Sequence, residues 1–386
     1  MKHQNFTLQL AVFALVSAAF TNIYITQPIL PVLQEEFSIT PVQVSMTVSI
    51  VILGIVLSNL FFGYLVDRIS IHPIILIGGI CVASGGVVCA MTHDFRILIF
   101  ARFFQGLFIP ALTTSLSAWL AQSLPANRLG VVMGSYVSAT VLGGLGGRLL
   151  GGWIHPPFHW RYAFLSAAVL IVITTILALI ILPQKPVKEK NIEHIPEGFV
   201  SLLMRKDLIL VYCCGAGGLL IFLPVFNFLP YRLAADPFNF STELITFTYF
   251  VYVMGIFLGP VAGRVSSSFG EGNTLIAGAG ILGFSILLLL IPSVIAVVSG
   301  LLGVCAGFFT IHSVAVGLLN KKLTQNHGKA NALYTLFYYI GGWIGITGAG
   351  FAFQKAGWNG VIFFVLFFLI IPLGTGLSEK RKNAFK

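Results

Sequence analysis

Long apolar segments recur along nearly the whole chain, separated by short polar or charged stretches. Each is about the 20 residues that an α-helix needs to cross the hydrocarbon core of a bilayer. The pattern predicts twelve membrane-spanning helices, near residues 8–30, 41–64, 73–92, 96–119, 129–154, 160–182, 208–230, 242–263, 273–292, 294–319, 330–353 and 359–378. The first segment follows Lys2 as a secretory signal would, but its apolar character continues to Leu30, so we interpret it as a span.

Composition supports a polytopic membrane protein. Hydrophobic residues make up 57% of the chain and Asp, Glu, Lys and Arg only 9%, against about 25% charged residues in ordinary soluble domains. The five cysteines fall inside predicted spans without the spacing of metal ligands. We therefore expect no metal site and no bound cofactor.

The distribution of basic residues predicts the orientation. With the N-terminus in the cytoplasm, 16 of the 22 lysines and arginines lie on the inner side and 4 on the outer side, while Arg102 and Arg148 lie within spans. This bias places both termini in the cytoplasm of a cell whose inner membrane holds the protein. The net charge of +10 then marks a membrane face that attracts anionic lipid rather than a nucleic-acid-binding surface.

An internal repeat divides the chain. Residues 183–206 form the longest polar connection, which predicts six-helix bundles over 1–182 and 207–386 joined by an irregular cytoplasmic linker. Shifting the first half by 198 positions superposes seven identical residues: Gly130 on Gly328, Tyr136 on Tyr334, Gly143 on Gly341, Gly144 on Gly342, Gly147 on Gly345, Gly152 on Gly350 and Trp160 on Trp358. Because six is even, the two halves are parallel repeats, an arrangement suited to alternating access.

Three stretches carry motifs. The first, "GYLVDRIS" at 63–70, resembles the cytoplasmic G-x-L-x-D-R-x-G loop of the major facilitator superfamily. The resemblance implies that Gly63, Asp67 and Arg68 form a conformational latch between the halves. The counterpart in the second half, "GPVAGRVSSSFG" at 259–270, keeps Arg264 but has no acidic residue.

The second stretch, "ARFFQG" at 101–106, resembles the R-x-x-Q-G motif of that superfamily. The resemblance implies that Arg102 takes part in proton coupling. The alternative is an arginine that snorkels to the outer surface, which its long stem permits.

The third stretch resembles the antiporter motif of span five: a glycine, eight residues, a glycine, three residues, Gly-Pro, two residues and Gly-Gly. The matching glycines are Gly134, Gly143, Gly147, Gly151 and Gly152, and Arg148 takes the place of the proline. Glycines at steps of four make one helix face on which a neighbouring helix can approach closely. A charge in a span is costly and faces protein or water, so Arg148 is expected to bind substrate or to donate to carbonyls at a helix break.

Together the motifs and topology identify the chain as similar to major facilitator transporters of the twelve-span, drug:proton antiporter type. This implies an all-α membrane protein of two parallel six-helix repeats whose spans one, four, seven and ten line a substrate cavity. The residues placed there are Asn22, Tyr24, Gln27, Gln105, Arg148, Asn227, His312, Tyr334 and Tyr338.

No carboxylate lies deep in a predicted span, which makes the cavity electropositive and favours an anionic or neutral amphiphilic substrate. If protons couple, His312 is the best carrier, since a histidine pKa of about 6.5 lies near working pH; a hydrogen-bonded neutral histidine is the alternative. The chain lacks the catalytic groups of an intramembrane enzyme. We expect a monomeric, proton-driven exporter of a small molecule, with a symporter or uniporter that imports a small anionic solute as the alternative.

Overall fold

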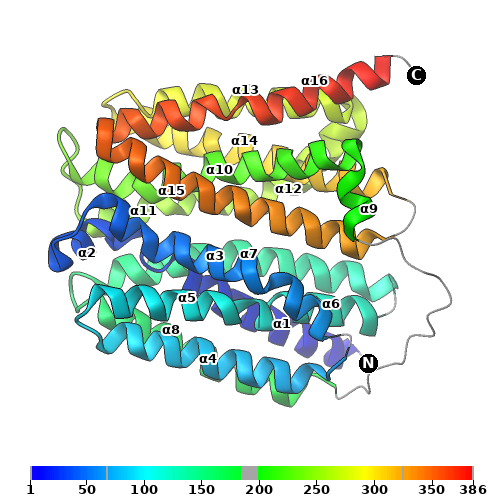
Figure 1. Ribbon diagram of the computed structural model, residues 1–386, viewed down its shortest axis with the longest axis horizontal. Coiled ribbons are helices and arrows are strands. Elements are labelled where there is room, and N and C mark those ends of the chain that lie inside the picture. The colour runs from blue at the N-terminus through cyan, green and yellow to red at the C-terminus, as the bar shows by residue number, and fades with distance from the viewer. Residues whose placement is uncertain (1, 67, 125, 184–198, 324–325, 385–386) are drawn as a thin grey trace. The chain divides into compact units, whose positions relative to one another are not determined.

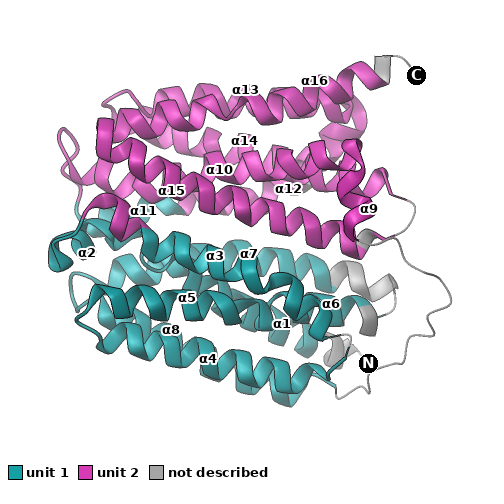
Figure 2. Ribbon diagram, viewed as in Figure 1, with its two compact units in different colours: residues 1–39, 46–191, 241–249 teal, residues 40–45, 192–240, 250–386 magenta. Residues whose placement is uncertain are grey.

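The computed structural model describes residues 2–66, 68–124, 126–183, 199–323 and 326–384, without the side chains of 2–5, 122–123, 126–131, 260, 327 and 383–384. The described part is all-helical and divides into two compact units (Figure 2). Unit 1 comprises residues 1–39, 46–191 and 241–249, and unit 2 comprises 40–45, 192–240 and 250–386.

Unit 1 is a helical bundle in which α4 packs against α5 and α8 and α1 packs against α7 (Figure 1). Its elements are α1 Lys2–Tyr24, η1 Gln27–Ile29, α2 Leu30–Phe37, α3 Pro41–Leu65, α4 Ile71–Met91, α5 Phe95–Leu112, α6 Thr114–Ser123, α7 Ala126–Ile154, α8 Arg161–Ile181 and α11 Thr242–Thr248. The first five residues of α3 are counted in unit 2, as part of the segment 40–45.

Unit 2 repeats this plan: α10 packs against α15, and α13 packs against α14 and α16 (Figure 1). Its elements are α9 Phe199–Met204, α10 Lys206–Ala234, η2 Tyr249–Val253, α12 Met254–Phe269, α13 Glu271–Leu288, α14 Val294–Lys321, α15 His327–Phe367 and α16 Ile370–Ala384. The first residue of η2, Tyr249, is counted in unit 1.

The predicted spans all fall on helices, and ten stretches of the described residues are long and apolar enough to cross a membrane. One of them, Gly328–Lys382, contains the last two predicted spans, which non-helical backbone at Ala356 and Gly357 separates. The fifth predicted span corresponds to α7. Within the predicted linker, residues 199–204 form α9, while residues 184–198 lie outside the described part.

The glycine stripe on α7 allows the close helix contact that the sequence predicts. A Cβ atom built on Gly143, Gly147 or Gly151 would lie 2.4, 2.2 and 1.9 Å from the carbonyl oxygens of Ser17, Thr21 and Ile25 in α1 and just after it. Only a hydrogen at these positions lets the two backbones meet. The stripe thus determines how α7 sits against the first span.

Unit 2 repeats the same contact between α15 and α10. A Cβ on Gly341 would lie 2.1 Å from the Ala216 carbonyl oxygen, and one on Gly345 would lie 2.4 Å from that of Leu220. Gly341 and Gly345 are the partners that the 198-residue shift assigns to Gly143 and Gly147. The sequence repeat is therefore a repeat of helix packing as well.

Candidate functional site

The first span of unit 1 is not one continuous helix: its helical structure is interrupted after Tyr24. Helix α1 ends at Tyr24, a short 3-10 helix follows at Gln27–Ile29, and α2 begins at Leu30. Pro28 and Pro31 have no backbone N–H and could not continue the bonding pattern of α1. A helix end leaves its last carbonyls without intrahelical donors, so partners must come from elsewhere.

Arg102 of α5 supplies those donors. Its Nη1 donates to the Asn22 carbonyl at 2.7 Å and its Nη2 to the Ile23 carbonyl at 2.9 Å, both in the last turn of α1. Its Nε donates to the Thr47 carbonyl of α3 at 2.9 Å, and Nη1 also reaches Gln105 Oε1 at 2.8 Å. The residue is fully buried, which excludes the snorkelling alternative.

The surroundings of Arg102 form a hub of polar side chains. Gln105 Nε2 donates to the Val82 carbonyl at 3.1 Å and to Asn22 Oδ1 at 3.3 Å, and Asn22 Nδ2 donates to the Ala18 carbonyl at 2.9 Å. The acceptors around the guanidinium are neutral, and the negative end of the α1 dipole points at the cation. Arg102 therefore joins α1, α3 and α5, and through Gln105 also α4, at the break.

Arg148 of α7 approaches the same break and is also fully buried. Its Nε donates to Gln27 Oε1 at 2.7 Å, and its Nη1 donates to the Gly144 carbonyl at 2.6 Å. The guanidinium carbon lies 4.2 Å from the ring centre of Tyr24 and 5.5 Å from that of Tyr249. Stacking on aromatic faces stabilises a cation where water is excluded.

Unit 1 therefore brings together five of the predicted cavity residues: Asn22 and Gln105 around Arg102, and Tyr24 and Gln27 around Arg148. Tyr249 was missed, because nothing in the sequence indicates that a residue about 100 positions later packs on α7. Gly152, in the motif, explains part of this packing: its Cβ would lie 1.9 Å from Thr246 Oγ1.

The candidates of unit 2 lie on α10, α14 and α15. His312 Nδ1 is 3.0 Å from the Tyr334 hydroxyl, and the His312 ring is centred 4.8 Å from Tyr338 and stacks on Phe308 at 5.9 Å. His312 and Tyr338 are half-buried, whereas Tyr334 and Asn227 are buried. A histidine hydrogen-bonded to a phenol can accept or pass on a proton.

The predicted latch is described only in part. Asp67 lies outside the described residues. Arg68 is exposed, with its guanidinium 4.8 Å from the Tyr64 ring, and Gly63 has space for a Cβ atom. Arg264 is exposed on α12, where its carbonyl accepts from Ser267 Oγ at 2.7 Å. The latch stays a prediction.

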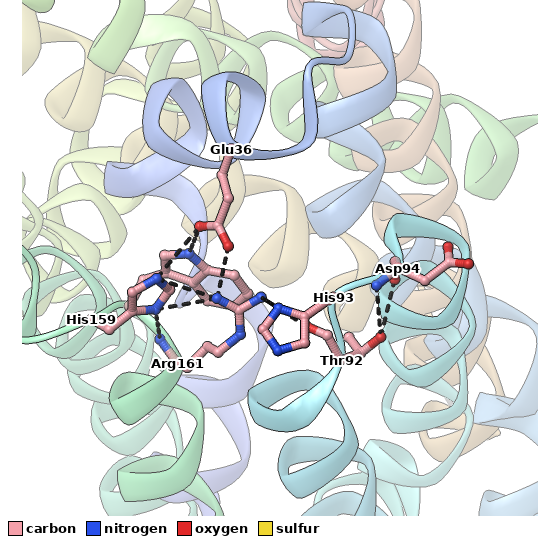
Figure 3. A network of polar contacts seen from close by, with 7 residues as sticks. Glu36, Thr92, His93, Asp94, His159 and Arg161 are labelled. Atoms are coloured by element: carbon pink, nitrogen blue, oxygen red, sulfur yellow. Dashed lines mark hydrogen bonds and ion pairs between the residues drawn. The ribbon is translucent and has the colours of Figure 1, made fainter.

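A polar network that sequence reasoning missed joins the end of α2 to the start of α8 (Figure 3). Arg161 Nη1 pairs with Glu36 Oε1 at 2.7 Å, and its Nη2 donates to the Thr92 carbonyl at 2.9 Å and contacts His93 Nδ1 at 3.1 Å. Trp160 Nε1 also donates to Glu36. Trp160, which the internal repeat pairs with Trp358, was the one residue of this network that the sequence analysis singled out. The repeat did not indicate Glu36 as its partner.

Comparison with known proteins places this geometry in a family. The family model described as Major Facilitator Superfamily matches residues 12–320. The inner membrane transport protein YnfM of Escherichia coli is 28% identical over 97% of this chain and 90% of its own length. The riboflavin transporter RibZ of Clostridioides difficile is 23% identical over 92% of this chain and 74% of its own length.

A solved structure has the same fold. A bacterial homologue of the human lysosomal transporter Spinster, in an inward-facing and unoccupied conformation, superposes with a TM-score of 0.82. The match covers 99% of this chain and 98% of the other, at 13% sequence identity. At that identity the likeness concerns the fold alone.

Proposed function

Because this chain belongs to the Major Facilitator Superfamily, we propose that it is a proton-coupled exporter of a small anionic or neutral amphiphilic molecule. The family and its relatives make the chain a multi-pass membrane transporter of a small molecule and not an enzyme. The substrate class, the direction and the driving ion are the parts proposed here.

The observation that carries the proposed substrate class is Arg148. A guanidinium that is fully buried at the broken span donates from Nε to a neutral amide oxygen, Gln27 Oε1. Arginine pairs with a carboxylate or phosphate are often bidentate, with two parallel N–H···O bonds, which adds energy and geometric specificity that a single amide oxygen does not supply. Gln27 is a side chain that can rotate, so an anionic group can take its place. The guanidinium itself, which stacks on the Tyr24 ring, also suits an aromatic, electron-rich group.

The name of the relative RibZ supports the neutral arm of this proposal, since riboflavin is a planar amphiphile without a fixed charge at its ring system. The aromatic cluster around His312 in unit 2 is also suited to such rings. We therefore retain both an anionic and a neutral aromatic substrate.

Substitution of Arg148 tests the substrate class. Arg148→Lys keeps the charge but loses the planar fork, so affinity for anionic ligands should fall about tenfold, and Arg148→Ala should lower it further. Binding is measured by thermal shift and calorimetry across matched anionic, neutral and cationic ligand sets, with exposed Arg96→Lys as the control. A lower melting temperature in Arg148→Ala with unchanged affinity and unchanged preference for anions would make the arginine structural.

His312 is the proposed proton carrier, because it is half-buried and hydrogen-bonded to Tyr334. His312→Ala should abolish substrate flux driven by a pH gradient in proteoliposomes, while substrate counterflow at equal pH continues. Tyr334→Phe, which keeps the ring and removes the hydroxyl, should reduce the pH-driven flux less. If His312→Ala retains pH-driven flux, the proton carrier lies elsewhere.

The direction of transport rests on the motif in α7, whose five glycines match the antiporter pattern. Arg148 in the place of the proline favours the alternative, an importing symporter or uniporter for a small anionic solute. The distribution of lysine and arginine supports cytoplasmic termini. Accumulation of substrate in inside-out vesicles upon acidification of the lumen identifies the antiporter. Uptake of substrate into right-side-out vesicles, in the same direction as an inward proton gradient, identifies the symporter.

A further inference from the structure

One face of α16 carries a groove that contains none of the residues proposed to act in transport. Its lining residues are Gly374, Leu377, Ser378, Arg381 and Lys382, and the groove has a volume of about 450 Å³. Their spacing of three and four places them along one stripe of the helix. Gly374 opens the groove at one end, since nothing lies within 4 Å of a Cβ built there.

The chain on the N-terminal side of the groove is exposed and apolar. Phe363, Phe367 and Ile370 are 64%, 73% and 68% exposed, and Leu377 within the groove is 50% exposed. These side chains belong to the stretch Gly328–Lys382, which is apolar enough to cross a membrane. They are therefore positioned to contact the acyl chains of the bilayer.

The other end of the groove is basic. Arg381 and Lys382 line it, and Lys380 is the exposed neighbour. The one acidic residue close by in sequence, Glu379, is 4% exposed and is paired with Lys322 Nζ of α14 at 2.8 Å as well as with Lys382 Nζ at 3.0 Å. Because Lys322 balances the Glu379 carboxylate, this end of the groove keeps a net positive charge.

The spacing along the groove fits a lipid. Gly374 and Arg381 are seven positions apart, which corresponds to about 10 Å along a helix. In a phospholipid the glycerol and ester groups lie between the phosphate and the acyl chains, so this length extends from the phosphate past the esters into the upper part of an acyl chain. Ser378, between the two ends, offers a small hydroxyl at the level of the glycerol ester groups.

We propose that this groove binds one anionic phospholipid, with its phosphate at Arg381 and one acyl chain over Gly374 and Leu377. Basic residues just beyond a membrane helix attract anionic headgroups, and the apolar floor distinguishes a lipid from a free anion. The groove contains none of the residues proposed to bind substrate, and the proposal is independent of whether the protein exports or imports.

Lipid binding is measured by native mass spectrometry of the full-length protein in detergent, titrated with phosphatidylglycerol or with phosphatidylcholine of the same chains. Arg381→Gln should weaken the tightest phosphatidylglycerol site about fivefold. Gly374→Leu should weaken it at least as much by filling the groove. The matched controls are Lys355→Gln, which removes an exposed charge on α15 outside the groove, and Gly280→Leu, which fills open space on α13. Neither control should change the affinity.

Three results would overturn the proposal. The first is an unchanged phosphatidylglycerol affinity in both Arg381→Gln and Gly374→Leu, each checked for wild-type elution and melting temperature. The second is equal retention of phosphatidylcholine, which would make the groove part of a non-selective lipid belt. The third is displacement of the lipid by millimolar inorganic phosphate, which would make it a site for free anions.

Discussion

Replacing Arg102 with methionine should destabilise unit 1 strongly, because this side chain stabilises the break in the first span. The substitution removes four hydrogen bonds, which reach the carbonyls of Asn22, Ile23 and Thr47 and the side chain of Gln105. Methionine has a similar length but no donor. Three backbone carbonyls at membrane depth would then lose these donors.

The size of the effect follows from these bonds. A buried polar group without a partner costs about 1–3 kcal/mol, whereas interhelical hydrogen bonds measured in membrane proteins average about 0.6 kcal/mol. Removing the cation also relieves its own desolvation, which offsets part of the loss. We expect Arg102→Met to lower the free energy of unfolding by about 2–4 kcal/mol. Arg102→Lys should cost less, since an ammonium can reach some but not all four acceptors.

Thermal unfolding in detergent measures this loss. Cys89 of α4 is fully buried in unit 1, so a thiol-reactive dye reports on opening of this unit in a variant that keeps Cys89 as its one cysteine. For a unit of this size about 1 kcal/mol corresponds to about 2–4 °C, so Arg102→Met should melt about 5–15 °C lower. The exposed Arg96→Met is the control and should melt within about 2 °C of the parent.

The coupling role that the motif implies predicts a different outcome. If Arg102→Met keeps the parent melting temperature but loses pH-driven flux while substrate counterflow continues, the arginine acts in coupling and the structural interpretation is wrong. If Arg102→Met loses stability and Arg102→Lys recovers the stability without recovering flux, the arginine acts in coupling in addition to its structural role.

Two further predictions concern packing and the network in Figure 3. Gly147→Val should lower the free energy of unfolding by about 1–3 kcal/mol, because its Cβ would lie 2.2 Å from a carbonyl oxygen of α1, whereas Gly134→Val, with open space around it, should melt like the parent. Glu36→Gln should cost about 1 kcal/mol by losing the partly exposed pair with Arg161, and the loss should shrink at high salt. Glu35→Gln serves as its control, and equal melting of the two Glu variants at low salt would contradict a stabilising pair.

Hydropathy predicted the helices but not the break in the first one. The span appears continuous because Ile23, Ile25 and Ile29 are apolar on both sides of Pro28. A proline in a span permits a kink, but whether a helix ends there depends on donors for the freed carbonyls. Those donors come from Arg102, which lies about 80 residues later in the sequence. A local sequence pattern cannot indicate a partner that far along the chain.

The glycine contacts were predictable for the opposite reason. Glycines at steps of four on a membrane helix indicate close approach of a partner helix. Because the internal repeat carries the same glycines at Gly341 and Gly345, it also predicted the second contact. The partner helix was not predictable from the stripe. The Glu36 network was less accessible still, since its residues come from three segments with no shared spacing.

The two buried arginines lie at the same break in the first span but have different hydrogen-bond acceptors. We therefore expect one to determine mainly the stability of the protein and the other mainly its ligand selectivity. Arg102 donates to backbone carbonyls, which cannot move without unfolding a helix end. Arg148 donates from Nε to the Gln27 side chain, which can change rotamer and release that donor. An incoming anion can therefore replace Gln27 at Arg148, whereas three of the four hydrogen bonds of Arg102 could be replaced only by displacing the main chain. It follows that variants of Arg102 should change melting temperature more than ligand preference, and variants of Arg148 ligand preference more than melting temperature.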